Sequence, residues 1–214
     1  MPKLARPGRP AADATRDLRR TLLHTSRQLL DDEGPSALSM REVARRAGCT
    51  HQAPYHYFAD RETILAALVA EGFDDLALRL HAAHRLAPTQ GVRAALVGSG
   101  RAYVAFALEQ PGVFRIMFRP DVCDPSRFPA AQEAGARARA ELDTLTQIVH
   151  GAKATPALAT SLWAHVHGLA CLLVDGPLAL HFDNATRRQT HVHEVIERFA
   201  DHLLGGAVEQ PVTR

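Results

Sequence analysis

The fold is decided by the stretch Leu38-Ser39-Met40-Arg41-Glu42-Val43-Ala44-Arg45-Arg46-Ala47-Gly48-Cys49-Thr50. Ser39 and Glu42 have the spacing of a capping box, in which each side chain bonds the free backbone N–H of the other residue at the start of a helix. Gly48 can take the left-handed conformation that ends a helix, because it has no Cβ atom. The stretch therefore predicts a short helix that begins after Ser39, a tight turn, and a second short helix that Thr50 caps.

Two short helices joined by a tight turn are the elements of a helix-turn-helix, and the small side chain of Ala44 would let them approach closely. Pro54 falls in the first turn of the second helix or just beyond it, where its missing N–H costs much less than the roughly 3 kcal/mol of a mid-helix proline. If this helix enters a major groove, His51 and Gln52 at its start face the base edges. A glutamine there can form two hydrogen bonds with adenine.

The hydroxyl groups of Thr50, Tyr55 and Tyr57 could donate to phosphate oxygens. Contacts of this kind set the register of a protein on DNA without reading its sequence. Tyr55 and Tyr57 could instead be half-buried core aromatics, and His51 and Gln52 could be ordinary solvent-facing residues of a short helix. Only the pattern as a whole separates these alternatives.

Apolar positions three and four residues apart dominate the rest of the sequence, and this spacing predicts an entirely helical fold. The first helix is expected from Asp13 to Glu33, where Gly34 and Pro35 stop it. Asp60 is placed to cap a later helix of about 24 residues. Further helices are expected at about 90–109, 111–118, 130–150, 156–174 and 185–204.

Composition limits the class of protein. A chain of 214 residues can bury about two-thirds of its unfolded surface, so its core needs neither a metal nor a disulfide. The three cysteines show no CxxC spacing, which favours a reducing cytoplasm. We expect no signal peptide, because no apolar stretch follows the basic, proline-rich start. We expect no membrane segment, because apolar runs such as Leu169–Val174 are far shorter than the roughly 18 residues that a span needs.

Positive charge is concentrated near the N-terminus. The first 60 residues carry ten Lys and Arg against seven Asp and Glu, an excess that either DNA binding or a solvated basic face explains. Lys3, Arg6 and Arg9 alternate with prolines and Gly8, so they form a flexible basic arm that could enter a minor groove. A disordered solubilising tail explains the same composition.

The stretch quoted above, with Tyr55-His56-Tyr57-Phe58 and Arg61-Glu62, resembles the DNA-binding signature of the TetR (tetracycline-repressor) family over about residues 15–65. The resemblance implies that Tyr55 contacts phosphate, that Phe58 packs in the core, and that Arg61, where lysine is commoner, contacts the DNA backbone. Pro54 stands where the family usually has an aliphatic residue. The expected DNA-binding residues are Ser39, Arg41, Thr50, His51, Gln52, Tyr55, Tyr57 and Arg61, with Lys3, Arg6 and Arg9 in the arm.

The helix expected at 156–174 is apolar around most of its circumference, so other elements must cover it on two sides. One face, with Trp163, His167 and Cys171, would point into its own domain. A second face would meet a partner subunit together with a stripe on the last helix, in a four-helix dimer interface. These interface residues are Leu162, Val166, Leu169, Leu173, Val192, Val195, Ile196, Phe199 and Leu203. Both stripes could instead be core of a single subunit.

The segment Ser161-Leu162-Trp163-Ala164-His165-Val166-His167-Gly168-Leu169-Ala170, with the upstream segment 106–118, resembles the WHG-type C-terminal domain of a TetR subfamily. Aromatic and thioether groups gather in these middle helices, where a bundle can enclose a cavity. The expected ligand-binding residues are Tyr103, Phe106, Phe114, Met117, Phe118, Trp163, His167 and Cys171, with Tyr103 and His167 as polar anchors. Each aromatic could instead be plain core. Gly98 and Gly100 would allow a bend or close packing.

The combined pattern predicts a ligand-responsive transcriptional regulator, a repressor, that binds a palindromic operator in double-stranded DNA as a homodimer. We assign residues 1–12 to the basic arm, 13–60 to the DNA-binding domain, 61–205 to the ligand-binding and dimerisation domain, and 206–214 to a flexible tail. A small-molecule effector would tilt the helix that begins after Asp60 and so change the separation of the two reading helices.

Two other classes of protein were weighed against this function. An enzyme or metal protein is suggested by the twelve histidines, but His165 and His167 face apart on a helix, and neither G-x-S-x-G nor H-E-x-x-H occurs. We therefore expect no catalysis and no cofactor or metal. A helical scaffold without DNA activity is the second alternative, and it leaves the capping box and the Tyr-x-x-Phe spacing unexplained.

Overall fold

The computed structural model describes residues 11–85 and 87–205; the expected tail and the expected arm residues Lys3, Arg6 and Arg9 lie outside this part of the chain. The described ranges contain α-helices and short 3-10 helices with no strand among them, which confirms the all-helical prediction. The α-helices are α1 (Ala11–Glu33), α2 (Met40–Arg46), α3 (Arg61–His84), α4 (Ala87–Glu109), α5 (Pro111–Met117), α6 (Pro129–His150), α7 (Pro156–Val174) and α8 (Ala185–Gly205). The 3-10 helices are η1 (Pro35–Ala37), η2 (Ala53–His56), η3 (Pro125–Arg127) and η4 (Gly151–Lys153).

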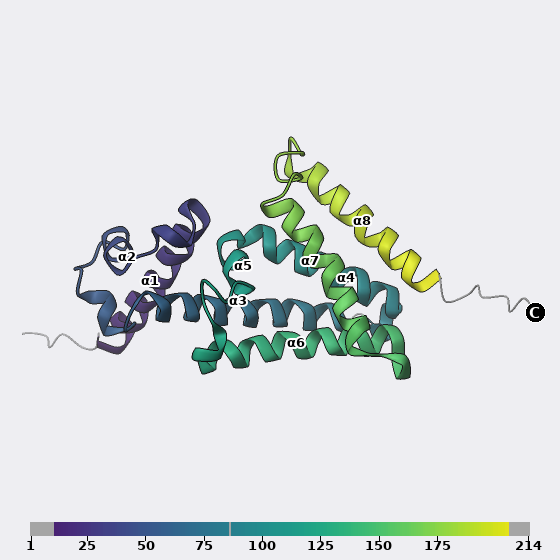
Figure 1. Ribbon diagram of the computed structural model, residues 1–214, viewed down its shortest axis with the longest axis horizontal. Helices are drawn as coiled ribbons and strands as arrows, with labels where there is room; N and C mark the ends of the chain where they lie inside the picture. Colours follow the sequence, from purple (N-terminus) through teal and green to yellow (C-terminus); the bar gives the residue numbers. More distant parts are fainter. Residues whose placement is uncertain (1–10, 86, 206–214) are drawn as a thin grey trace, which may run out of the picture.

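The long helix α3 is the central element. It starts beside α1 and α2 at one end of the molecule and runs into the bundle, where α6 lies along it and α4 packs against it (Figure 1). The helices α7 and α8 both pack on α4, and the short α5 sits between α1 and the bundle. This arrangement makes α3 and α5 the two elements that connect the N-terminal helices with the rest of the chain.

The buried side chains form two clusters. The first extends from α1 and α2 through α3 to α5 and α6, and it includes Leu22, Val43, Phe58, Leu68 and Phe114. Each such side chain contributes roughly 1.5–3 kcal/mol when fully buried. The second cluster lies among α4, α6, α7 and α8. Because the first cluster is continuous across residue 60, the N-terminal helices are packed directly onto the C-terminal part, and the domain boundary there stays a prediction.

The start of α3 follows the sequence closely. A side-chain oxygen of Asp60 accepts a hydrogen bond from the backbone N–H of Thr63 at 2.8 Å, and the helix that follows has the expected 24 residues. The chain enters α4 differently, because Gly91 has a positive φ of 87° that breaks the helix near its start. The Gly100 prediction of close packing is confirmed, since a Cβ atom there would lie 3.0 Å from Ile196 on α8.

The helix α7 is long and apolar enough to cross a membrane by length and composition, with a mean hydropathy of 1.5, and no other described helix passes that test. The length of the apolar runs in the sequence predicts no such segment. One such helix is weak evidence for a membrane span, and only 28% of the apolar window is buried inside the subunit. The exposed residues of α7 include Ala157, Ala164, Gly168 and Leu172, an apolar face of a kind that marks interaction surfaces.

Candidate DNA-binding and ligand-binding sites

The start of α2 is held by half of the predicted capping box. The Ser39 hydroxyl oxygen accepts a hydrogen bond from the backbone N–H of Glu42 at 3.2 Å. The Glu42 carboxylate accepts hydrogen bonds from Arg45 and Arg46 instead of reaching back to Ser39 in the described structure. The hydrogen bond from Arg45 is the largest of the influences that lower the pKa of Glu42 to about 2. Arg46 also bonds Asp32 and Glu33, which ties the end of α2 to the end of α1.

The turn after α2 is built as the sequence predicts. Gly48 has a φ of 66°, and the backbone N–H of Cys49 donates to the carbonyl oxygen of Ala44 at 3.1 Å. Ala44 is buried where the following segment crosses the helix. A larger side chain at this position would push the two segments apart.

The segment after the turn differs from the prediction, because it is the 3-10 helix η2 and not an α-helix capped by Thr50. Successive N–H groups bond carbonyls three residues back, such as Ala53 to Thr50 at 3.0 Å and Tyr55 to Gln52 at 3.1 Å. Pro54 has no N–H to donate to residue 50, which removes one α-helical bond from a segment too short to lose any. The cost of Pro54 in this short segment is therefore larger than the prediction assumed.

The side chains expected to read DNA are exposed around η2. Tyr55 is 52% exposed, and Thr50, His51 and Gln52 are exposed beside it. Arg41, at the start of α2, shares a shallow depression with His51 and Tyr55. Phe58 is buried in the first core cluster, as the resemblance implied, and Tyr57 is half-buried against the same cluster. The leading end of the segment is therefore open to a partner.

Arg61 lies at the start of α3 but points back into its own domain. Its guanidinium donates to the carbonyl oxygens of Leu38 at 2.9 Å and Pro35 at 2.6 Å. Two of its five N–H donors are thus used to hold the loop between α1 and α2 against α3. A contact of Arg61 with the DNA backbone stays a prediction, and it would use the remaining N–H donors. A contact of Ser39 with DNA also stays a prediction, and it would use the hydroxyl proton of Ser39.

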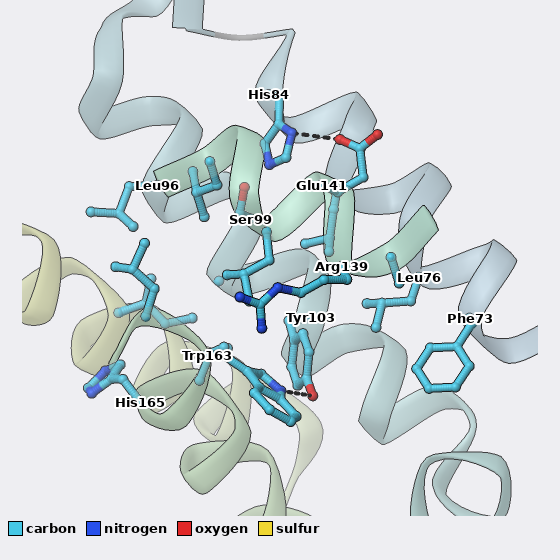
Figure 2. Close-up of a pocket in the computed structure, with 18 of the residues that line it drawn as sticks. Phe73, Leu76, His84, Leu96, Ser99, Tyr103, Arg139, Glu141, Trp163 and His165 are labelled. Atoms are coloured by element: carbon cyan, nitrogen blue, oxygen red, sulfur yellow. Dashed lines mark hydrogen bonds and ion pairs between the residues drawn. The ribbon is translucent and has the colours of Figure 1, made fainter. Parts of the chain in front are cut away.

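A cavity of about 320 Å³ lies at the other end of the molecule, among α3, α4, α6, α7 and α8. Its walls are mostly apolar, with the aromatic rings of Phe73, Tyr103 and Trp163 on one side (Figure 2). The ring of Phe118 lies between Phe73 and Trp163, 5.6 Å from each. The polar residues His84, Ser99 and Glu141 lie at its other end, and Arg139 extends beside them. An apolar cavity with few polar groups is the usual form of a small-molecule site.

Two hydrogen bonds connect side chains at the aromatic end of the cavity, which is called the aromatic wall below. The indole N–H of Trp163 donates to the Tyr103 hydroxyl oxygen at 3.1 Å, and this hydroxyl is 2.8 Å from Nδ1 of His167. Burial raises the pKa of Tyr103 and lowers the pKa of His167, so the tyrosine keeps its proton and the histidine is neutral. The hydroxyl accepts a hydrogen bond from Trp163 and shares a second one with Nδ1 of His167, so both of these contacts lie inside the wall.

Comparisons with known proteins bear on both ends of the molecule. Residues 22–68 match the family model described as bacterial regulatory proteins, tetR family, and residues 96–199 match the model of a tetracyclin repressor-like C-terminal domain. The chain belongs to the TetR family. HTH-type transcriptional regulators of Mycobacterium bovis and Mycobacterium tuberculosis are 32% identical over 65 residues, which is 30% of this chain and 28% of theirs.

Solved structures share the fold over nearly the whole chain. A protein of unknown function from Rhodococcus sp. RHA1 is 28% identical, with a TM-score of 0.73, over 94% of this chain and 98% of that one. The TetR family transcriptional regulator PfmR from Thermus thermophilus is 18% identical, with a TM-score of 0.63, over 88% of this chain and 99% of that one. The second likeness supports the fold alone.

In this TetR-family chain, the expected ligand residues separate into three groups. Tyr103, Phe118 and Trp163 line the cavity. Phe106, Phe114 and Met117 are buried in the first core cluster and are not among the residues that line this cavity, so their role in ligand binding stays a prediction. His167 lies behind the wall, and Cys171 is exposed. Cys171 is eight residues after Trp163, so its side chain is rotated by about 80° around the helix axis relative to Trp163. This rotation places Cys171 on the exposed side of the helix.

The residues of the interface stripe expected on α7 and α8 fall into two groups in the structure. Leu162, Leu169, Leu173, Val192 and Ile196 are buried within the single chain, where both helices pack on α4. The remaining stripe residues, Val166, Val195, Phe199 and Leu203, are partly buried against the same cluster. Four of the stripe residues line the cavity: Leu162, Val166, Ile196 and Phe199. The monomer-core alternative therefore describes the five buried residues, and an interface role of the four partly buried ones stays a prediction. The exposed surface of α7 is its opposite face.

Sequence reasoning missed the polar end of the cavity. His84 continues the buried stripe of Leu76 and Leu80 at intervals of four residues on α3, and this periodicity could have placed it inside. Ser99 and Glu141 carried no signal of their own, because they come from helices whose rotation the sequence does not specify. No group of three or more His, Cys, Asp or Glu side chains suited to a metal ion occurs in the described ranges.

Proposed function

We propose that this TetR-family chain is a ligand-responsive transcriptional repressor that binds a palindromic operator as a homodimer. The observation that carries the proposal is the exposed leading end of residues 50–55, which is seated on a buried framework of Ala44 and Phe58. A DNA-binding regulator acts where the chromosome is, so a cytoplasmic location belongs to the same proposal. A non-enzymatic function is likewise expected of a member of a family of regulators.

The proposed roles at the DNA follow from exposure and chemistry. Gln52 reads a base edge, and its amide lies 3.0 Å from the His51 ring, which orients both side chains. Tyr55, Thr50 and Arg41 contact phosphates and set the register. The half-buried Tyr57 contributes its hydroxyl at the edge of this surface.

The DNA-reading roles are tested by measuring the affinity of the full chain for a specific and a random duplex at one salt concentration. Tyr55→Phe is expected to lower affinity for both duplexes by a similar factor, since it removes a phosphate contact. Gln52→Ala is expected to reduce the preference for the specific duplex by roughly tenfold, since a paired base contact is worth about 1–3 kcal/mol. An equal loss on both duplexes for Gln52→Ala would contradict its reading role.

A second copy of this chain is the proposed occupant of the exposed face of α7. That face carries the small or apolar residues Ala157, Ser161, Ala164, Gly168 and Leu172, all exposed in the subunit. Small residues let two helices approach closely, and no Cβ atom at Gly168 would meet anything within 4 Å in the subunit. The proposed dimer uses the two helices expected from the sequence, with α7 turned to its other face. It also supplies the two reading segments that a palindrome requires.

The proposed ligand response passes through α5. Gly112 in its first turn donates its backbone N–H to the Asp31 carboxylate at 2.6 Å, which seats α5 on the end of α1. Burial raises the pKa of Asp31, and the hydrogen bond from Gly112 opposes that rise. Phe118 follows α5 directly and lines the cavity, where its ring is 5.6 Å from that of Trp163.

A ligand that displaces Phe118 would therefore move α5, and with it α1 and the reading segment. It releases DNA only if it binds more tightly to the arrangement that fits DNA poorly. The helix α3 offers a parallel route, because it carries both Ile64 in the N-terminal core and His84 at the cavity.

A further inference from the structure

Two buried polar atoms at one end of the cavity have no hydrogen-bond partner among the described residues: Nε2 of His84 and the hydroxyl oxygen of Ser99. The His84 side chain is 6% exposed and Ser99 is 2% exposed, and both residues line the cavity. Buried polar atoms are almost always paired in native proteins. Partners for these two atoms are therefore expected from a molecule that enters the cavity.

The chemistry of His84 decides what that molecule must offer. Its Nδ1 lies 2.8 Å from a carboxylate oxygen of Glu141, which can only accept, so Nδ1 carries the ring proton. Burial is the largest influence on the pKa of His84 and lowers it, which keeps the ring neutral near pH 7. A neutral ring with its proton on Nδ1 presents a bare Nε2, which accepts a hydrogen bond and cannot donate one.

Ser99 complements this acceptor, because a hydroxyl group can donate and accept. A ligand hydroxyl has the groups that both atoms need: it can donate its proton to Nε2 of His84 and accept one from Ser99. A carboxylate has no proton to give to Nε2 and would bring a second negative charge toward Glu141. The nearby Arg139 uses its Nε to bond the exposed Asp143 at 3.2 Å, so its charge is partly neutralised, and its remaining N–H groups are what a carboxylate probe would test.

The rest of the cavity is suited to an apolar body. The Tyr103 hydroxyl at the aromatic end is already bonded to Trp163 and His167. Nε2 of His165 is also without a hydrogen-bond partner among the described residues. The His165 ring stacks on Phe199 and is only partly buried, so it has less need of a hydrogen bond from the ligand than the buried His84 ring has. Polar recognition is therefore concentrated at His84 and Ser99.

We propose that the effector is an apolar molecule with one neutral hydroxyl group, an alcohol or a phenol, which binds between Nε2 of His84 and the hydroxyl of Ser99. This inference rests on the proposed ligand response and names the chemical class of the ligand. The aromatic side chains Phe73, Phe118 and Trp163 hold the apolar body at the opposite end of the cavity.

Four probes with one apolar body test the proposal: 4-butylphenol, butylbenzene, 4-butylbenzoate and 4-butylbenzylammonium. Each is titrated into the full chain by calorimetry, and the fluorescence of Trp163, the single tryptophan of the sequence and part of the cavity wall, reports entry into the cavity. The phenol is expected to bind at least about tenfold more tightly than butylbenzene, because a site built for a hydroxyl rejects the analogue that lacks it. The benzoate and the ammonium compound are expected to bind more weakly than the phenol.

Ser99→Ala should remove most of the phenol's advantage and leave the affinity for butylbenzene unchanged, while the exposed Ser36→Ala serves as the matched control. His84→Gln, which keeps a polar side chain, should also weaken phenol binding if Ser99→Ala proves unstable. The proposal is overturned if no probe binds, if the charged probes bind most tightly, or if phenol and butylbenzene bind equally.

A mobility shift with DNA separates this proposal from the proposed function. Sequence-specific DNA binding without any probe binding would overturn the hydroxyl site and leave the DNA-binding function standing. The predicted order of probe affinities without any release of DNA would support the hydroxyl site and count against the ligand response.

Discussion

The contact between α5 and α1 can be tested by the single substitution Gly112→Ala. A Cβ atom on residue 112 would lie 2.5 Å from the carbonyl carbon of Leu30 and 2.6 Å from the backbone nitrogen of Asp31. Carbon atoms in good contact are about 3.5–4.0 Å apart, so the two helices would have to separate by roughly 1 Å. Overpacking of this kind typically costs about 1–3 kcal/mol, and the hydrogen bond from Gly112 to Asp31 would lengthen as well.

The expected result is a loss of roughly 1–3 kcal/mol in the free energy of unfolding, measured by urea titration of the full chain. Gly135→Ala on α6 is the matched control, because its Cβ atom would meet the Phe73 ring at an ordinary 3.7 Å. This control should gain up to about 1 kcal/mol from the higher helix propensity of alanine.

A shift of α1 also carries α2 and the reading segment with it, so Gly112→Ala should weaken DNA binding without ligand while Gly135→Ala does not. The reasoning fails if Gly112→Ala is as stable as the parent protein.

Two further predictions concern the dimer and the response to pH. Ala164→Glu places a charge on the exposed face of α7 and should convert the protein to a monomer in sedimentation experiments. The control Ala136→Glu, at an exposed position of α6, should remain a dimer. A dimeric Ala164→Glu protein would contradict the proposed face. Burial lowers the pKa values of His84, His165 and His167 below the ordinary 6.5, so the unfolded chain binds more protons than the folded chain just below that pH. Their contribution to stability is present above pH 6.5 and is lost as the pH falls below it. Urea titrations at several pH values should therefore show a free energy of unfolding that declines as the pH is lowered below 6.5. A constant or rising free energy of unfolding would refute the neutral state of these rings.

Much of the fold could be predicted because its signals are local. The hydroxyl of Ser39 and the carboxylate of Asp60 mark helix starts, and both accept the expected backbone hydrogen bonds. The bounds of α7 agree with the predicted 156–174, since Pro156 begins the helix and the chain turns after Val174. Each of these features depends on residues within one turn of each other.

The errors arose where the outcome depends on contacts distant in sequence. Nothing local in α7 says which of its two apolar faces meets α4 of the same subunit, and the prediction chose the wrong one for Leu162 and Leu169. The polar end of the cavity is assembled from α3, α4 and α6, so Ser99 and Glu141 become neighbours of His84 only in the folded chain. The 3-10 geometry of η2 is a local feature that was missed, because the cost of Pro54 in so short a segment was judged too small.

Selection of bound duplexes from a random DNA pool tests the central claim most directly. The full chain is mixed with the pool at one salt concentration, and the bound duplexes are sequenced after repeated rounds. The account predicts enrichment of a two-fold symmetric site, with half-site centres about 34–36 Å apart. The same experiment with Gln52→Ala should change the enriched bases within each half-site. A bound pool that stays as random as the starting pool would contradict the assignment of residues 40–58 as a DNA-reading segment.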